Sequence, residues 1–301
     1  MAAGMISSDA VKSLFDTASG IFGKDIKELL ESDAAVLKRT DVSQPAITAA
    51  NLAAAAYLGE KGFHPCACAG FSLGEYAALT IAGVISAADC LRLVKARGEI
   101  MQQAADNLPR NGDEASGMAA VVGIAPERAE SLIAEWTASG KIRDLYAANI
   151  NSPKQLVVSG TAAALTQSQT LFMEAGAKRF IRLQVAGPFH SPLMEEARKA
   201  FLPVLETISF SDPVIPVFSN VTGGLISSGT QAKELASIHI TSPVRWIDEE
   251  AAAAKLGVDA CLEAGPGNVL QGLWRDFSSV YGGEINVFAA GTAEDINSII
   301  V

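Results

Sequence analysis

The chain has 301 residues, a formal net charge of −10 and a hydrophobic fraction of 49%. This length is enough for one large domain or two ordinary ones, each with its own buried core. The acidic balance argues against nucleic acid as a partner, because phosphate binding needs a basic field. No apolar run reaches the roughly 20 residues of a membrane-spanning helix, and the N-terminus lacks the regions of a secretory signal. We therefore expect a cytoplasmic protein with no membrane partner.

The first third of the chain is mainly helical by its pattern. The expected helices cover residues 8–17, 24–31, 44–61, 74–82 and 87–105. Ser86, with Asp89 three residues later, forms a capping-box arrangement for the last of them. A strand of small residues, 65–72, leads through a turn into the helix at 74–82.

The middle of the chain alternates strand and helix patterns. Strands are expected at "GMAAVVGI", "IRDLYAANI", "KQLVVSG" and "KRFIRLQV", with helices at "APERAESLIAEWTA" and "TAAALTQSQTLFMEAGA". The resulting β-α-β-β-α-β order is that of a ferredoxin-like unit. We predict an α/β protein in which a ferredoxin-like subdomain at 117–186 is inserted into an α/β-hydrolase-like parallel-sheet core formed by 1–116 and 187–301.

The four cysteines, Cys66, Cys68, Cys90 and Cys261, do not form a metal-binding signature. Cys66 and Cys68 are separated by one residue instead of two, and no cysteine or histidine pair lies near them at ligand spacing. We expect buried, reduced thiols and no metal site.

The pentapeptide G-F-S-L-G at 70–74 fits the G-x-S-x-G nucleophile elbow, in which a serine lies on a sharp turn between a strand and a helix. Ser72 is thus a candidate nucleophile. The alternative, a serine that caps the 74–82 helix, is compatible with that role. The helix N-terminus would favour a developing oxyanion at the backbone N–H of Leu73.

A serine nucleophile needs a base, and the chain has three histidines. His190 lies in a loop between a strand and a helix, where α/β enzymes hold catalytic groups, and it is the favoured candidate. His239 is the second candidate, and His64 is interpreted as a surface residue. No acid between Ser72 and His190 is flanked like the acid of a hydrolase triad, so backbone carbonyls are the expected partners of the base.

Eight sequence segments, taken together and in their order along the chain, indicate a protein family. They are "QPAITAA", "GFSLGEYAAL", "AGVISAADCLRLVKARGEIMQ", "AANINSPKQLVVSG", "GAKRFIRLQVAGPFHSPLM", "PVFSNVTG", "TSPVRW" and "LEAGPGNVLQGL". Together they closely resemble the malonyl-CoA:acyl-carrier-protein transacylases and the related acyltransferase domains of fatty-acid and polyketide synthases. One such motif would be weak, whereas eight in the family's order, over nearly the whole chain, are specific.

The resemblance implies a serine acyltransferase that moves a malonyl group from malonyl-CoA to the phosphopantetheine thiol of an acyl carrier protein. It makes Ser72 the acylated serine, His190 its base, and Arg97 the residue that binds the malonyl carboxylate. From the residues alone, Arg97 is more simply a solvated helix residue. The implied substrates are CoA and phosphopantetheine thioesters, with no metal or redox cofactor. The pathway, fatty acid or polyketide, stays open, and a monomer is expected.

Three further positions take substrate-site roles by resemblance. Asn149 matches an active-site asparagine, and Phe189 is the residue type associated with malonyl over methylmalonyl selection. At His239 the family offers a backbone carbonyl to the ring N–H of the catalytic histidine, so this side chain need not take part.

Carrier proteins of this family are usually acidic, so docking by an acidic chain needs a local basic patch. Lys178, Arg179 and Arg182 are the candidates for this patch, with Arg245 and Arg275 as alternatives.

The sequence departs from the family at its start. The family begins with a strand and a G-Q-G-S-Q-like loop whose glutamine helps to form the oxyanion hole. This sequence opens at "AAGMISSDAVKSLFD", which resembles the family's chain just after that loop. We expect an incomplete gene model in preference to an impaired homologue, because Ser72, Arg97 and His190 are retained. An organellar location, in a plastid or mitochondrion, is the alternative if a transit peptide was lost with that segment.

Two other function classes remain open from the sequence. A serine thioesterase or hydrolase would release the acyl group to water and need no thiol acceptor. An inactive truncated homologue would bind carrier protein or a synthase partner without catalysis.

Overall fold

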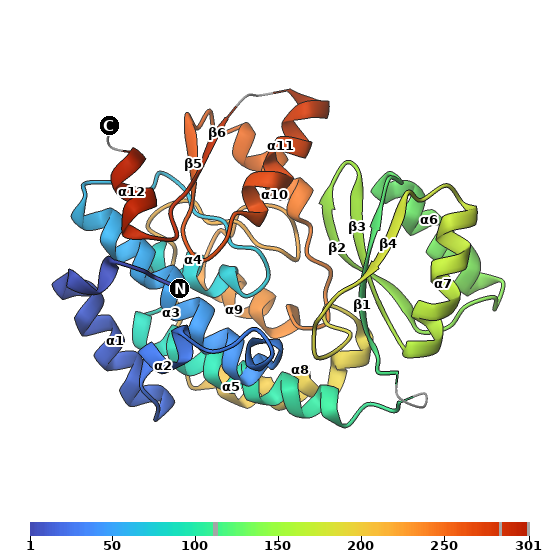
Figure 1. Cartoon of the computed structure of the whole chain (residues 1–301), viewed down its shortest axis with the longest axis horizontal. Helices are drawn as coiled ribbons and strands as arrows, with labels where there is room; N and C mark the ends of the chain where they lie inside the picture. Colours follow the sequence, from blue (N-terminus) through green and yellow to red (C-terminus); the bar gives the residue numbers. More distant parts are fainter. Residues whose placement is uncertain (111–113, 283–284, 300–301) are drawn as a thin grey trace.

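The computed structural model describes residues 1–110, 114–282 and 285–299, and it contains a helix-rich part beside a four-stranded sheet with two helices (Figure 1). The helices are α1 (Asp9–Phe22), α2 (Ile26–Leu30), α3 (Thr40–Glu60), α4 (Gly74–Ile81), α5 (Ala87–Asp106), α6 (Pro126–Ala138), α7 (Ala162–Glu174), α8 (Glu195–Glu206), α9 (Gly229–Ile238), α10 (Trp246–Ala254), α11 (Val269–Tyr281) and α12 (Ala293–Ile299). Three 3-10 turns are η1 (Met5–Ser7), η2 (Val36–Lys38) and η3 (Pro192–Met194). The strands are β1 (Gly117–Val122), β2 (Leu145–Ser152), β3 (Gln155–Gly160), β4 (Arg179–Arg182), β5 (Ala260–Glu263) and β6 (Asn286–Ala289).

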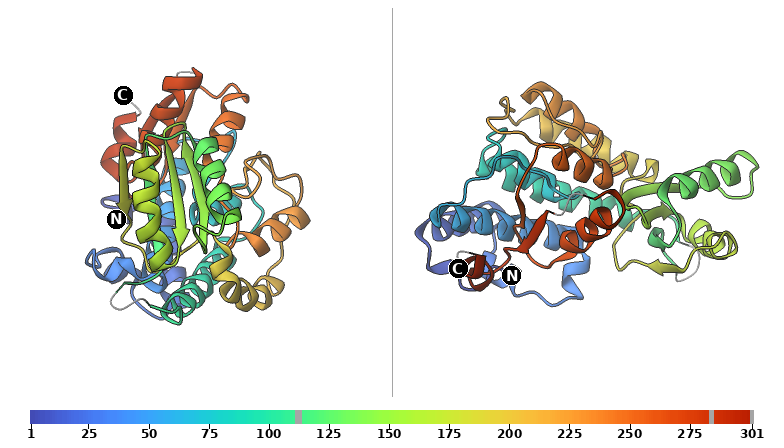
Figure 2. Two further views of the ribbon diagram at one scale, coloured as in Figure 1. Left: turned by 90° about the vertical axis from the view of Figure 1, so that its right-hand side faces the viewer. Right: turned by 90° about the horizontal axis from the view of Figure 1, so that it is seen from above.

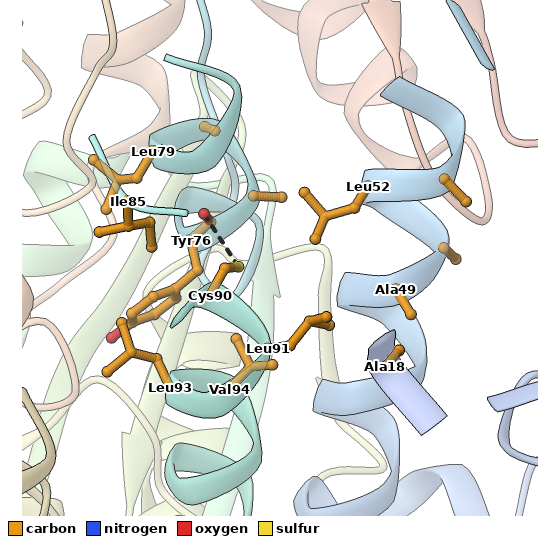
Figure 3. Packing of buried hydrophobic residues seen from close by; sticks show 14 of the residues in the cluster. Ala18, Ala49, Leu52, Tyr76, Leu79, Ile85, Cys90, Leu91, Leu93 and Val94 are labelled. Carbon is orange, nitrogen blue, oxygen red and sulfur yellow. Dashed lines mark hydrogen bonds between the residues drawn. The ribbon is translucent and has the colours of Figure 1, made fainter. Parts of the chain in front are cut away.

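Helices α3 and α5 cross closely in the main core. A Cβ on Gly98 of α5 would lie 2.5 Å from the carbonyl oxygen of Thr40, so only glycine permits this approach. The Thr40 hydroxyl donates to the Gly98 carbonyl at 2.8 Å across the same crossing. Figure 3 shows Leu52 of α3 and Leu91 of α5 pointing toward each other in this core. The tight crossing also fixes the position of α5, which carries Arg97.

The four-stranded sheet is antiparallel with strand order β2-β3-β1-β4, and its elements follow the predicted strand and helix order along the chain. Helices α6 and α7 cover its outer face (Figure 2, left). On its other face, Met118 and Val157 belong to a small apolar cluster against which Phe189 packs. At the β2 edge, Asn149 is bridged in parallel to Val244. The inner face and one edge of the sheet therefore adjoin the segments that carry His190 and Ser242.

Outside this sheet, the parallel pairing in the described residues is confined to short stretches. Strands β5 and β6 pair in parallel, and Cys68 forms a single parallel bridge to Val217. The predicted strand at 65–72 is wrong in its length, because only Cys68 is paired. The sharp turn that begins at Gly70 ends the extended stretch directly after this bridge.

The cysteines carry free thiols, and the expectation that all of them are buried is confirmed for Cys90 alone: Cys68 and Cys261 are half-buried, and Cys66 is exposed. Within the described ranges, no group of three or more His, Cys, Asp or Glu residues is placed to hold a metal ion. In the same ranges, no helix has the length and apolar character needed to cross a membrane.

Candidate active site

The turn at 70–74 has the geometry of a nucleophile elbow. Ser72 has φ 49°, in the left-handed region that residues other than glycine rarely adopt. A Cβ on Gly70 would lie 2.1 Å from the backbone carbon of Gly74, so glycine is required where the chain folds back on itself. Helix α4 starts at Gly74, and no acceptor in the described part of the chain receives the N–H of Leu73. A free backbone donor thus lies beside the Ser72 hydroxyl at a helix N-terminus.

His190 contacts the serine directly. Its Nε2 lies 2.7 Å from the Ser72 Oγ, although 118 residues separate the two in sequence. The other ring nitrogen, Nδ1, faces the carbonyl oxygens of His239 at 3.2 Å and Ser242 at 3.1 Å. Because a carbonyl only accepts hydrogen bonds, Nδ1 carries the hydrogen, and Nε2 is left to accept the serine proton. Two backbone carbonyls hold the base, as the sequence predicted, and the second of them, from Ser242, was not foreseen.

The surroundings of His190 keep it neutral. Burial, followed by the positive charge of Arg97, lowers the pKa of the His190 imidazole from 6.5 to about 4, and the bonds to the two carbonyls act in the opposite direction. At neutral pH the imidazole is therefore in the basic form. His190 also has a left-handed backbone, with φ 56°. Ser72 and His190 are thus both held in sparsely populated conformations, which cluster at functional sites.

Arg97 is buried instead of solvated, contrary to the simpler interpretation of its sequence. Only 1% of its surface is exposed, and the guanidinium carbon lies 5.5 Å from the ring centroid of Tyr76. Its Nη1 donates to Gln44 Oε1 at 2.8 Å, while Nε and Nη2 have no hydrogen-bond partner in the described residues. An unpaired buried cation costs free energy, so this group is suited to an anionic ligand that supplies two parallel acceptors.

The remaining predicted residues occupy different positions around this centre. Leu73 follows the nucleophile, and the Phe189 carbonyl accepts a short hydrogen bond from the Ser159 hydroxyl. The Asn149 side chain makes no hydrogen bond to Ser72 or His190 within the described chain, although its backbone is bridged beside Val244. The structure therefore brings the Asn149 backbone near the site without a polar contact to the serine or its base.

The His239 side chain, which the resemblance left without a role, is fully buried at 1% exposure. Its Nε2 lies 3.2 Å from the side-chain oxygen of Asn220. Asn220 also contacts the elbow and was not foreseen. It lies in the quoted segment "PVFSNVTG", but no spacing rule pointed to it.

Comparisons with known proteins show the family of this chain. The family described as "Acyl transferase domain" matches residues 7–288. The malonyl CoA-acyl carrier protein transacylase of Bacillus subtilis is 38% identical over 265 residues, covering 88% of this chain and 81% of the relative. The crystal structure of MCAT from Streptococcus pneumoniae aligns with a TM-score of 0.88 at 30% identity, covering 100% of this chain and 95% of that one.

A third match is a structure described as a type II PKS acyl-carrier protein in complex with its malonyl-transacylase. It has a TM-score of 0.87 and 31% identity, and covers 98% of this chain and 94% of the matched one. The α/β fold is therefore similar to that of malonyl transacylases, and most of the chain lies within the family match. On these grounds, the chain belongs to the acyl transferase domain family.

Proposed function

We propose that the protein transfers a malonyl group from malonyl-CoA to the phosphopantetheine thiol of an acyl carrier protein through a malonyl-serine intermediate. The observation that supports this proposal is the buried Arg97: two of its donors have no hydrogen-bond partner in the described residues, and its charge acts on the pKa of His190, whose Nε2 lies 2.7 Å from the Ser72 Oγ. The family match and the names of the relatives agree with this activity.

The reaction runs in two half-reactions with the same base. His190 Nε2 takes the Ser72 proton as the oxygen attacks the malonyl thioester carbonyl, and the Leu73 N–H stabilises the tetrahedral oxyanion. The carbon–sulfur bond breaks, and the CoA thiolate leaves with the proton returned by His190. The carrier protein's thiol then gives its proton to His190, attacks the malonyl ester, and releases Ser72, which regains the proton.

Arg97 is expected to select malonyl over acetyl. A charged hydrogen bond contributes about 1.5–3 kcal/mol, which corresponds to about 10- to 100-fold at about 1.4 kcal/mol per decade. We expect Arg97→Ala to lower the malonyl/acetyl ratio of acylation rates by this factor. Intact mass spectrometry after incubation with each CoA ester measures both adducts.

The matched control for this variant is Lys95→Ala, which removes a cation from the same helix. Lys95 Nζ donates to the Ile21 carbonyl at 3.1 Å and is not among the charges that shift the pKa of His190. Unchanged malonyl/acetyl selectivity in Arg97→Ala would remove Arg97 from the substrate site. Rapid release of the acyl group to water, without a carrier-protein requirement, would favour a hydrolase.

Docking of an acidic carrier protein is proposed at the end of the four-stranded sheet. Lys178 and Arg179 are exposed, whereas Arg182 is half-buried, and its Nη2 donates to the Thr166 hydroxyl at 3.0 Å. Arg245, one of the alternatives, forms an ion pair with Asp248 at 2.6 Å. Two accessible cations therefore remain from the predicted patch.

We expect the double variant Lys178→Glu/Arg179→Glu to raise the KM for holo carrier protein about 3- to 10-fold at low salt, because rim charges act mainly on association. Acylation by malonyl-CoA should not change. The matched control is Lys24→Glu/Lys27→Glu, two exposed cations beside α2. Equal carrier-protein kinetics for the two double variants would exclude this docking surface.

We also propose a division of the chain into a core and an inserted subdomain. We assign residues 117–186 to a ferredoxin-like subdomain, supported by the β2-β3-β1-β4 strand order, and residues 1–116 and 187–301 to an α/β-hydrolase-like core. The bacterial sources of the named relatives give the organellar alternative no support.

A further inference from the structure

The side chain of Asn220 contacts the backbone of the elbow at two residues. Its Oδ1 accepts the Ser72 N–H at 2.6 Å, and its Nδ2 donates to the Gly70 carbonyl at 2.7 Å. The two partners fix the amide orientation, because Ser72 N–H only donates and Gly70 C=O only accepts. One carboxamide therefore joins the first residue of the elbow, Gly70, to Ser72, the residue with the left-handed backbone.

The remaining polar atoms of Asn220 are also hydrogen-bonded. Nδ2 donates its second hydrogen to Glu249 Oε1 at 2.7 Å, and the Asn220 backbone N–H donates to Glu75 Oε2 at 2.7 Å. His239 Nε2 lies 3.2 Å from Oδ1, which accepts hydrogen bonds, so this nitrogen carries the hydrogen. Asn220 is fully buried, and Glu249 is 1% exposed. The amide thus uses all its donors and acceptors in a water-excluded network.

We propose that Asn220, supported from behind by Glu249, is a positioning residue that holds Ser72 in its left-handed conformation and keeps its hydroxyl aligned with His190. The proposal rests on the proposed function, in which Ser72 is the nucleophile. It extends that function because Asn220 and Glu249 touch neither the substrate handle Arg97 nor the base. Their effect reaches the reaction through the elbow backbone, 148 residues away in sequence from Asn220, and Asn220 also contacts His239, whose carbonyl accepts from the base.

Glu249 acts in this network as an acceptor, through its Oε1. Burial, and then the negative charge of Glu75, raise the pKa of Glu249 well above its usual range. A glutamine at this position keeps an acceptor oxygen of the same reach and carries no charge. Glu249→Gln keeps the hydrogen bond to Asn220, whereas Glu249→Leu removes it. Comparing the two variants therefore isolates the effect of the hydrogen bond from the effect of replacing the glutamate.

The test measures serine reactivity by two routes, namely malonyl transfer kinetics and the rate of Ser72 labelling by a fluorophosphonate probe. Asn220→Ala is expected to lower kcat and the labelling rate about 100-fold, the loss typical of a reacting group displaced by about 1 Å, with the KM for malonyl-CoA within about 3-fold of the wild-type value. Glu249→Leu is expected to lower both rates about 10-fold, and Glu249→Gln to restore most of the loss.

Gln102→Ala is the matched control for Asn220→Ala. Gln102 is also a buried carboxamide that joins two elements, because its Oε1 accepts the Thr40 N–H at 2.9 Å, but it does not touch the elbow. This variant should lose thermal stability and keep kcat and the labelling rate. Equal losses of kcat in Gln102→Ala and Asn220→Ala would reduce Asn220 to a structural role and overturn the proposal.

If Asn220→Ala does not fold, the two Glu249 variants decide: equal rates for Glu249→Leu and Glu249→Gln contradict the proposal. Measuring both malonyl transfer and fluorophosphonate labelling also distinguishes a failure of this proposal from a failure of the proposed function. Slow fluorophosphonate labelling of the variants, in a protein whose wild type accepts no malonyl group, would reject malonyl transfer and support the positioning role. Wild-type labelling rates in all variants of a protein that transfers malonyl would reject the positioning role alone.

Discussion

Ser72→Ala is expected to take up no malonyl group from malonyl-CoA and to lose malonyl transfer by about 10⁵- to 10⁶-fold, the loss typical of removing a nucleophile that acts together with its base. The Ser72 Oγ is the atom within 2.7 Å of the His190 imidazole. Alanine has no oxygen to form the ester, while the rest of the elbow can keep its backbone. Intact mass spectrometry and peptide mapping after incubation with malonyl-CoA measure the adduct.

The control for Ser72→Ala is Ser86→Ala. Ser86 is an exposed serine whose hydroxyl accepts the Asp89 N–H at 3.1 Å at the start of α5. This variant loses a helix cap, which costs about 1 kcal/mol of stability, and should still form the adduct. A malonyl adduct that persists in Ser72→Ala would show that another residue is the acyl acceptor.

The sequence was sufficient to single out Ser72 and His190, whose Oγ and Nε2 atoms lie 2.7 Å apart in the structure. The G-x-S-x-G spacing predicted the sharp turn, and Gly70 and Ser72 adopt the geometry that this turn needs. His190 followed from its place in a loop between a strand and a helix. Both inferences rest on local patterns, in which a few neighbouring residues decide the backbone conformation.

The network behind the elbow could not be predicted in the same way. Asn220 and Ser242 act through a side chain and a carbonyl that reach the elbow and the base from distant segments. Their contacts exist only after the chain segments have packed together, and their residue types are common in loops. Without an alignment or a structure, no spacing distinguishes them from ordinary turn residues.

The burial of Arg97 could not be predicted for a different reason. The periodicity of a single helix does not show which other helix packs against a given face. The residue alone suggested a solvated position on α5. In the structure α3 covers this face of α5, and Gln44 of that helix accepts a hydrogen bond from the guanidinium. Only the resemblance, which compares whole chains, assigned Arg97 to the site before the packing was known.

In the proposed reaction, the buried charge of Arg97 connects substrate recognition with the base. Arg97 contributes to lowering the pKa of His190, and burial contributes more. A malonyl carboxylate bound to Arg97 compensates the positive charge and removes part of this effect. The imidazole should therefore become a stronger base when the correct substrate is bound than when the site is empty.

His190→Ala is expected to lower the rate of Ser72 acylation about 10²- to 10⁴-fold, the usual contribution of a general base. In the wild type, the pKa of about 4 at His190 places the acid limb of kcat/KM near pH 4. Because the folded pKa is lowered, the basic form persists from neutral pH down through the ordinary histidine value and is lost only as the pH falls through about 4. Fluorophosphonate labelling between about pH 3 and about pH 8 measures this limb with a probe that has no titrating carboxylate.

Arg97→Ala should move the acid limb to higher pH, because removing the positive charge removes one of the two causes that lower the pKa of His190. Lys95→Ala, on the same helix, should leave it in place. The maximal labelling rate distinguishes loss of charge from damage to the site, because a loosened site that admits water would also raise the pKa of His190 but would slow labelling at every pH. A wild-type limb at the ordinary value near 6.5, or an Arg97→Ala limb that coincides with the wild-type one, would contradict the view that burial and the Arg97 charge together set the strength of the base.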